Sequence, residues 1–148
     1  MLRPSRFGSI VVVAALGIAI AGCGTASSST SPSSPSPAGG SIAVTLNEWS
    51  VAPASSSASP GSVTFAVTNG GTQVHEFVVV KTDTAADALP VVDNKIDEST
   101  LTPVDEIEDI AVGASPTLTV DLAAGHYVLL CNIEAHYEQG MHADFDVE

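Results

Sequence analysis

The sequence GHYVLLCNIEAHYEQGM, residues 125–141, carries the strongest structural signal in the chain. Gly125 marks a turn, and the run that follows is rich in Tyr, Val and Leu, which is typical of a β-strand. Cys131 ends this run, and His136 and Met141 follow at intervals of five residues. The segment therefore predicts a strand that leads into a loop bearing a thiol, an imidazole and a thioether.

Short β-type runs recur along the rest of the chain, separated by turn signals. They comprise residues 42–46, 62–68, 75–80, 117–122 and 143–147. No long segment has strong helical periodicity. Regular spacing of short strands predicts an all-β fold, an antiparallel-rich β-sandwich, with Trp49 and Phe65 expected in its core.

Residues 83–109 differ from the rest, with nine acidic residues and one lysine. We expect a long, solvated acidic connection there, with one short helical turn near residues 104–110. A calcium site formed by Asp93, Asn94, Asp97 and Glu98 is the alternative. Their spacing does not match the calcium-binding loop, and no glycine stands at its sharp turn, so solvation is the preferred interpretation.

The N-terminus has the pattern of an export signal. Arg3 and Arg6 precede a run of apolar and small residues that is shorter than the about 20 residues of a membrane-spanning helix. Residues 20–23, Ile-Ala-Gly-Cys, resemble the lipobox of bacterial lipoproteins, although an ordinary signal peptide that contains a cysteine is the alternative. We expect a lipoprotein signal peptide at 1–22, lipid on Cys23, a Ser/Pro/Gly-rich linker to residue 40, and one domain at 41–148. The predicted location is the outer face of the cytoplasmic membrane.

Charge and cysteine content narrow the function classes. The formal net charge is −13, and residues 23–148 contain only Lys81 and Lys95 as cations against seventeen acids. Such a field disfavours nucleic acid as a partner and favours a basic protein partner, unless it serves solubility alone. The chain has only two cysteines, so lipid on Cys23 would leave Cys131 without a disulfide partner. An unpaired cysteine in an exported protein indicates a reactive thiol or a metal ligand.

Four side chains form the candidate metal site. His75 begins a predicted strand 56 residues before Cys131, and His136 and Met141 share the loop after that cysteine. Two histidines and a cysteine in a trigonal set, with a weak axial methionine, define a type 1 (blue) copper site. The thiolate and thioether favour Cu(I), whereas imidazole serves both oxidation states. The sequence therefore predicts one copper ion bound by these four residues.

This pattern resembles the cupredoxin family, which includes plastocyanin, azurin, rusticyanin and auracyanin. The resemblance covers residues 41–148 and is strongest in the Gly-x-Tyr strand before Cys131 and in the two four-residue gaps of the ligand loop, which are most similar to rusticyanin and auracyanin. It implies a Greek-key sandwich of about eight strands with copper at one end. It also implies a one-electron carrier rather than an enzyme. A carrier needs an edge of His136 that is reachable from outside, and Tyr137 is expected either to flank this edge or to serve packing alone.

One position departs from the family. Several members have Asn or Ser directly after the first histidine ligand, where this chain has Glu76. Its carboxylate is expected to accept a hydrogen bond near the thiolate and to lower the reduction potential. We also expect Asn132, which follows the cysteine, to lie close to the ligands.

Two other functions use similar residues. A copper store, scavenger or chaperone would use the same four ligands, but such sites are usually richer in Met or His than this chain, which has two methionines. A copper enzyme would need a second metal site and more protein than the 108 residues of the predicted domain. A monomeric electron carrier with a protein redox partner is therefore the main hypothesis.

Overall fold

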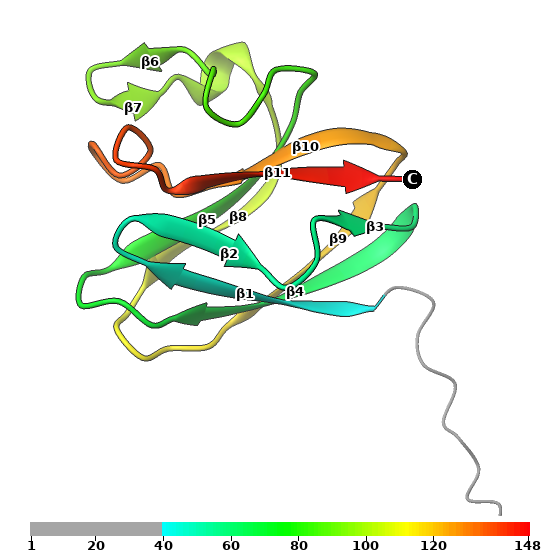
Figure 1. Ribbon diagram of the computed structural model, residues 1–148, viewed down its shortest axis with the longest axis horizontal. Coiled ribbons are helices and arrows are strands. Elements are labelled where there is room, and N and C mark those ends of the chain that lie inside the picture. The colour runs from blue at the N-terminus through cyan, green and yellow to red at the C-terminus, as the bar shows by residue number, and fades with distance from the viewer. Residues whose placement is uncertain (1–39) are drawn as a thin grey trace, which may run out of the picture. The chain divides into compact units, whose positions relative to one another are not determined.

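The computed structural model describes residues 40–148. The predicted signal peptide, the linker and Cys23 lie outside the described residues. Within residues 40–148 the chain forms a two-sheet β-sandwich without an α-helix, which confirms the all-β prediction (Figure 1). None of the described helices is long and apolar enough to cross a membrane.

The first sheet has four strands and the second has five. In spatial order, the first sheet contains β2 (Ser50–Pro53), β1 (Ser41–Asn47), β4 (Gly61–Asn69) and β9 (Thr117–Leu122). The second contains β3 (Ser57–Ala58), β11 (His142–Val147), β10 (Gly125–Leu130), β5 (His75–Lys81) and β8 (Thr102–Ile110). Only β1 with β4 and β11 with β3 pair in parallel, and the other pairs are antiparallel.

Alternating side chains build the core between the sheets. In β1 and β9 every second residue is buried, as expected for strands with one face toward the core and one toward solvent. Phe65 is fully buried and lies 5.4 Å from the rings of both Phe77 and Phe145, so its prediction as a core residue is confirmed. Trp49 is 38% exposed, and its assignment to the core was wrong. It stands in the turn between β1 and β2, beyond Leu46, the last buried residue of β1.

The acidic segment is more ordered than its composition suggested. It contains a small hairpin, β6 (Val91–Val92) with β7 (Lys95–Ile96), the short 3-10 helix η1 (Glu98–Thr100), and the nine-residue strand β8. The expectation of a helical turn near 104–110 was therefore wrong. Residues in β8 pair with β5, where backbone hydrogen bonds to a buried strand favour extended conformation over a local turn.

This segment also covers the outer face of β5. Val78 and Val80 of β5 are fully buried on the side away from the main core. Apolar side chains from the acidic segment pack on them, namely Ala86, Leu89 and Ile96. Most acids of the segment are exposed, as expected for a solvated connection, but its few apolar residues are buried against the sheet, which a purely solvated connection would not show.

Candidate metal centre

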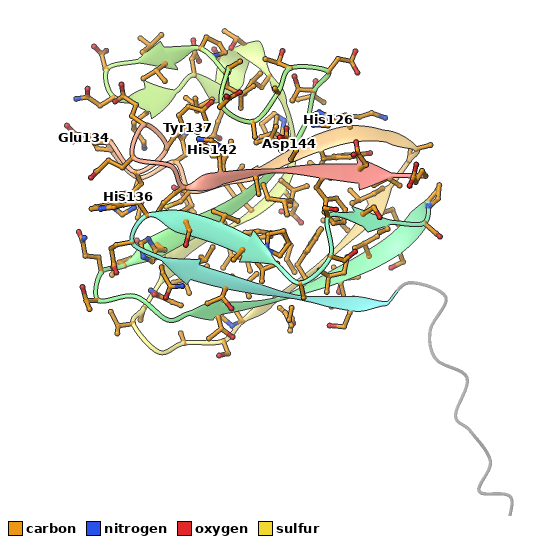
Figure 2. The ribbon with its side chains drawn as sticks, in the orientation of Figure 1. His126, Glu134, His136, Tyr137, His142 and Asp144 are labelled. Atoms are coloured by element: carbon orange, nitrogen blue, oxygen red, sulfur yellow. The ribbon has the colours of Figure 1, made fainter. Side chains whose placement is uncertain are left out.

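Strand pairing brings the predicted ligands to one end of the sandwich. His75 is the first residue of β5, and Cys131 directly follows β10. The two strands are antiparallel neighbours with Leu130 opposite Val78, so the start of β5 and the end of β10 lie at the same end of the sandwich. His136 belongs to the loop between β10 and β11 (Figure 2). Met141 is the last residue of the same loop, directly before β11.

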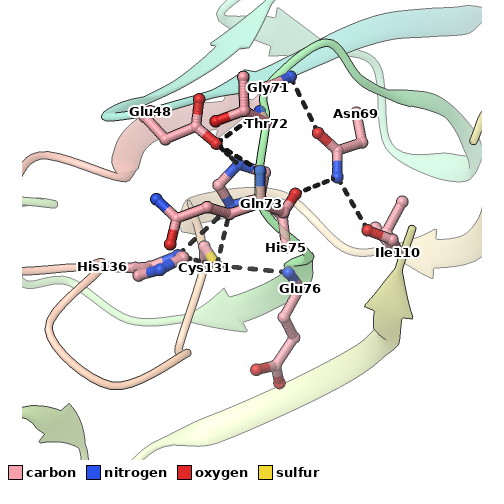
Figure 3. Close-up of polar contacts among 10 residues, drawn as sticks. All are labelled: Glu48, Asn69, Gly71, Thr72, Gln73, His75, Glu76, Ile110, Cys131 and His136. Atoms are coloured by element: carbon pink, nitrogen blue, oxygen red, sulfur yellow. Dashed lines mark hydrogen bonds and ion pairs between the residues drawn. The ribbon is translucent and has the colours of Figure 1, made fainter. Parts of the chain in front are cut away.

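Three donor atoms lie close together at this end of the sandwich (Figure 3). The Nδ1 atoms of His75 and His136 are 3.3 Å apart, and Cys131 Sγ lies 3.9 Å and 3.4 Å from them. His75 and Cys131 are fully buried, and His136 is 5% exposed. The structure thus brings together the two imidazoles and the thiol that were predicted from the sequence as metal ligands.

The ligand loop is closed by its own backbone. The Met141 N–H donates to the His136 carbonyl at 3.1 Å, and the Cys131 N–H donates to the Met141 carbonyl at 3.0 Å. The Met141 side chain is fully buried. Gly140 has φ of 113°, and a Cβ there would lie 3.1 Å from the carbonyl oxygen of Trp49, so the loop requires glycine at this point.

The electrostatics suit a soft metal ion. Burial raises the pKa of the Cys131 thiol, while the N–H of Glu76 donates to its sulfur at 3.3 Å and supports the thiolate. Burial, together with the nearby His75, lowers the pKa of His136 and keeps its imidazole neutral. Neutral imidazoles and a thiol that loses its proton to a metal are the states in which these groups bind copper. The donor set therefore fits the predicted ion.

Aromatic side chains surround the loop in an unexpected way. The rings of Trp49 and His136 meet edge to face, with centroids 5.2 Å apart. Because His136 is only 5% exposed, the expectation of an open His136 edge was wrong. Tyr137 is buried away from that edge. Its hydroxyl donates to the Ala86 carbonyl and accepts from the Leu89 N–H, and its ring packs on His142 (Figure 2).

The residues Glu76 and Asn132, which directly follow two of the ligands, make defined contacts of their own. The Glu76 backbone contacts the thiol, whereas its carboxylate lies near those of Glu98 and Glu106. Burial, and then repulsion from Glu106, raises the pKa of Glu76 to about 7. Asn132 makes two hydrogen bonds with the backbone of Ile96, at 2.7 Å and 3.0 Å. It therefore fastens the β6–β7 hairpin to the ligand loop.

Sequence reasoning missed Glu48. Its Oε1 lies 3.3 Å from the Nε2 of His75 and accepts hydrogen bonds from the N–H groups of Thr72 and Gln73, at 2.8 Å each. No spacing rule connects residue 48 with residue 75. The parallel pairing of β1 with β4 places the turn after β1 beside the loop before β5.

Comparison with known proteins agrees with this geometry. The family model for the sulfocyanin (SoxE) domain matches residues 51–148. A search of curated proteins gave no match. Among solved structures, auracyanin from Roseiflexus castenholzii is similar at 24% identity, over 73% of this chain and 96% of that chain, with a TM-score of 0.56. An azurin from Methylomonas sp. strain J is similar at 16% identity, over 73% and 97%, with a TM-score of 0.52.

Auracyanin A from Chloroflexus aurantiacus, described as a blue copper protein, is similar at 20% identity, over 74% of this chain and all of that chain, with a TM-score of 0.50. The structural similarity to these proteins shows that this chain has the cupredoxin fold. The family match spans more than half of the chain and both ligand segments. The chain therefore belongs to the sulfocyanin (SoxE) domain family, and its cluster of His75, Cys131, His136 and Met141 is typical of a type 1 copper site.

Proposed function

We propose that this chain is a one-electron carrier in which His75, Cys131, His136 and Met141 hold a single copper ion. The observation that carries this function is the convergence of two imidazole nitrogens and a thiol sulfur within 3.3–3.9 Å in a buried site. Bound copper supplies a one-electron couple between Cu(I) and Cu(II).

The protein's contribution is a fixed donor set. His75 and Cys131 are held by paired strands, and hydrogen bonds within the ligand loop fix the backbone of His136 and Met141. Side chains in a packed interior change position little, so the same donors can serve both oxidation states. Burial also keeps water away from the ligands.

An absorption spectrum tests this function directly. The purified protein with Cu(II) should have an intense visible band from charge transfer between the Cys131 thiolate and the metal. Cys131→Ser should abolish the band. A colourless Cu(II) complex of the unchanged protein would contradict the proposed site.

An electron carrier also differs from a copper store because it retains its copper ion while electrons enter and leave. Carrier function predicts reversible one-electron voltammetry without copper loss. Rapid surrender of Cu(I) to a modest chelator, combined with slow electron exchange, would favour copper handling instead.

The proposed location is the outer face of the cytoplasmic membrane, through lipid on Cys23. Its support is the lipobox-like stretch at residues 20–23 after a basic and apolar N-terminus. The native protein should then sediment with membranes, and Cys23→Ser should release it or leave it unprocessed. Mass spectrometry that finds an unmodified N-terminus beyond residue 23 would exclude the anchor.

A basic protein is the proposed redox partner, because the chain is strongly acidic. The rate of electron exchange with a cationic partner should fall as ionic strength rises, since salt screens the attraction. An unchanged rate between low and high salt would remove the electrostatic docking and leave the acidic surface with a role in solubility.

A further inference from the structure

The turn between β1 and β2 places a carboxylate behind the first histidine of the metal centre. Nε2 of His75 is buried and makes no aligned hydrogen bond within residues 40–148. Glu48 Oε1 is 3.3 Å from this nitrogen, and the Glu48 side chain is 19% exposed. Nδ1, the other nitrogen of the same ring, faces Cys131 and His136 (Figure 3). The ring of His75 therefore lies between the donor cluster and a carboxylate.

The position of this carboxylate is fixed by the loop before β5. The N–H groups of Thr72 and Gln73 both donate to Glu48 Oε1 at 2.8 Å. A Cβ on Gly71 would lie 2.6 Å from the same oxygen, so this residue must be glycine for the carboxylate to stay where it is. The loop thus holds a charged oxygen against His75.

A second loop contact supports the same arrangement. Asn69 donates to the carbonyl groups of Gln73 and Ile110 at 2.8 Å and accepts from the Gly71 N–H at 2.9 Å. Asn69 is 1% exposed. It ties residues 71–73 to the end of β8, so the loop cannot readily move away from Glu48.

We propose that Glu48 is a positioning residue for the copper site, which accepts the Nε2–H of His75, keeps the Nδ1 lone pair directed at the metal, and biases the site toward Cu(II). This inference rests on the proposed electron-carrier function. Carboxylates that accept the remote N–H of a ligand histidine fix its tautomer and orientation, and their loss typically weakens metal binding about 10- to 100-fold. A negative charge near the metal also stabilises the more positive ion.

The test compares three variants. Glu48→Gln removes the charge and keeps the shape of the side chain. Gly71→Ala leaves the charge but inserts a methyl group where the carboxylate now lies. Glu138→Gln is the matched control, because it removes the same charge from an exposed residue of the ligand loop.

Copper affinity and reduction potential are the first readouts. Glu48→Gln and Gly71→Ala should both weaken Cu(II) binding more than Cu(I) binding. A tenfold difference between the two losses corresponds to a rise in potential of about 59 mV. Glu138→Gln should shift the potential by clearly less. Equal potentials in wild type, Glu48→Gln and Gly71→Ala would overturn the proposal, as would an equal shift in Glu138→Gln.

The second readout needs no copper. Nitrogen-15 NMR of the histidine rings in the metal-free protein should show His75 with its proton on Nε2. Glu48→Gln and Gly71→Ala should lower the population of that tautomer. A wild-type protein without the visible band would contradict the electron-carrier function alone, because the tautomer is measured separately. A His75 that carries its proton on Nδ1 would overturn the positioning role.

Discussion

At the residue scale, the four donor side chains are held in place by different parts of the fold. Cys131 and His75 stand at strand ends and are fully buried, and the N–H of Glu76 contacts the sulfur. Met141 is held through its backbone bonds to His136 and Cys131. The Met141 side chain is also fully buried, so residues of similar size are the substitutions that disturb the packing least.

Substitution of Met141 should change the reduction potential in opposite directions. Met141→Leu removes a weak donor, which disfavours Cu(II), so the potential should rise. Met141→Gln supplies a harder oxygen, which favours Cu(II), so the potential should fall. Voltammetry measures both, and Met141→Leu should keep the visible band because the thiolate remains. Unchanged potentials in both variants would mean that the methionine does not contact the metal.

Trp49 offers an independent probe of the same site, because it is the only tryptophan. Its ring lies 5.2 Å from that of His136. Cu(II) should therefore quench most of the tryptophan fluorescence of the metal-free protein. Cys131→Ser should reduce the quenching at the same copper concentration, and Trp49→Phe should remove the emission without loss of the visible band. Strong emission from the copper-loaded protein would contradict this placement of the ring.

At the element scale, the strands and the ligand loop were predictable and the covering segment was not. The runs at 62–68, 75–80, 117–122 and 143–147 all lie in observed strands, because their alternation or apolar density has a strong local signal. β8 contains four acids and one proline, which obscured its extended conformation. Its pairing with β5 is a long-range interaction that local composition does not report.

The residues of the candidate site also divide into those that could be predicted from the sequence and those that could not. Cys131, His136 and Met141 share one short loop, and their spacing in the sequence already indicated a metal site. His75 was recognisable only as a histidine at a strand start. Glu48 and Trp49 carried no such signal, because their contacts with the two histidines depend on how the β1–β2 turn lies beside loops more than twenty residues away.

The contact between the side chains of His126 in β10 and Asp144 in β11 should make the free energy of unfolding depend on pH. His126 lies between the Thr82 carbonyl at 2.7 Å and the Asp144 carboxylate at 3.0 Å. Partial burial acts against protonation, but these two contacts prevail and raise the pKa of His126. A raised folded-state pKa means that the stabilisation is fully present below the unfolded pKa of about 6.5 and is lost as pH rises through the folded value.

Both partners are partly exposed, so this contribution should stay below about 1 kcal/mol. Urea unfolding of the metal-free protein at several pH values measures it, with Asp144→Asn compared against Asp121→Asn, an exposed carboxylate on β9. Only the Asp144 variant should flatten the decline in stability above pH 6.5. The same slope in both variants would exclude this contact as its source.

At the scale of the whole molecule, the two sheets share one core, and the metal centre rests on its end. Phe65 from the first sheet contacts Phe77 and Phe145 of the second. Phe77 lies two residues from His75 in β5, so packing in the core and the position of the ligand strand are coupled. Loss of the core should therefore affect both unfolding and copper binding.

Phe65→Ala should lower the free energy of unfolding by about 3–5 kcal/mol, because it removes a fully buried ring and leaves a cavity. Val112→Ala, at a position that is 55% exposed, should change it by less than about 0.5 kcal/mol. Denaturant unfolding of the metal-free protein gives both values. A Phe65→Ala variant as stable as the Val112→Ala control would contradict the single shared core.

The direction of β1 has a practical consequence for how the domain can be attached to a surface. Ser41 begins β1 at the end of the sandwich opposite to Glu48, and seven residues of strand span roughly 20 Å. β11 also ends there, since Val147 pairs with Gly125, far along β10 from Cys131. A domain immobilised on an electrode through an added tag at Glu148 would consequently have the end that carries Trp49 and the ligand loop facing away from the electrode. The same protein immobilised through a cysteine introduced at position 138 would turn that end toward the electrode. Because electron transfer slows steeply with distance, attachment at Glu148 should give slow interfacial electron exchange and attachment at position 138 should give fast exchange.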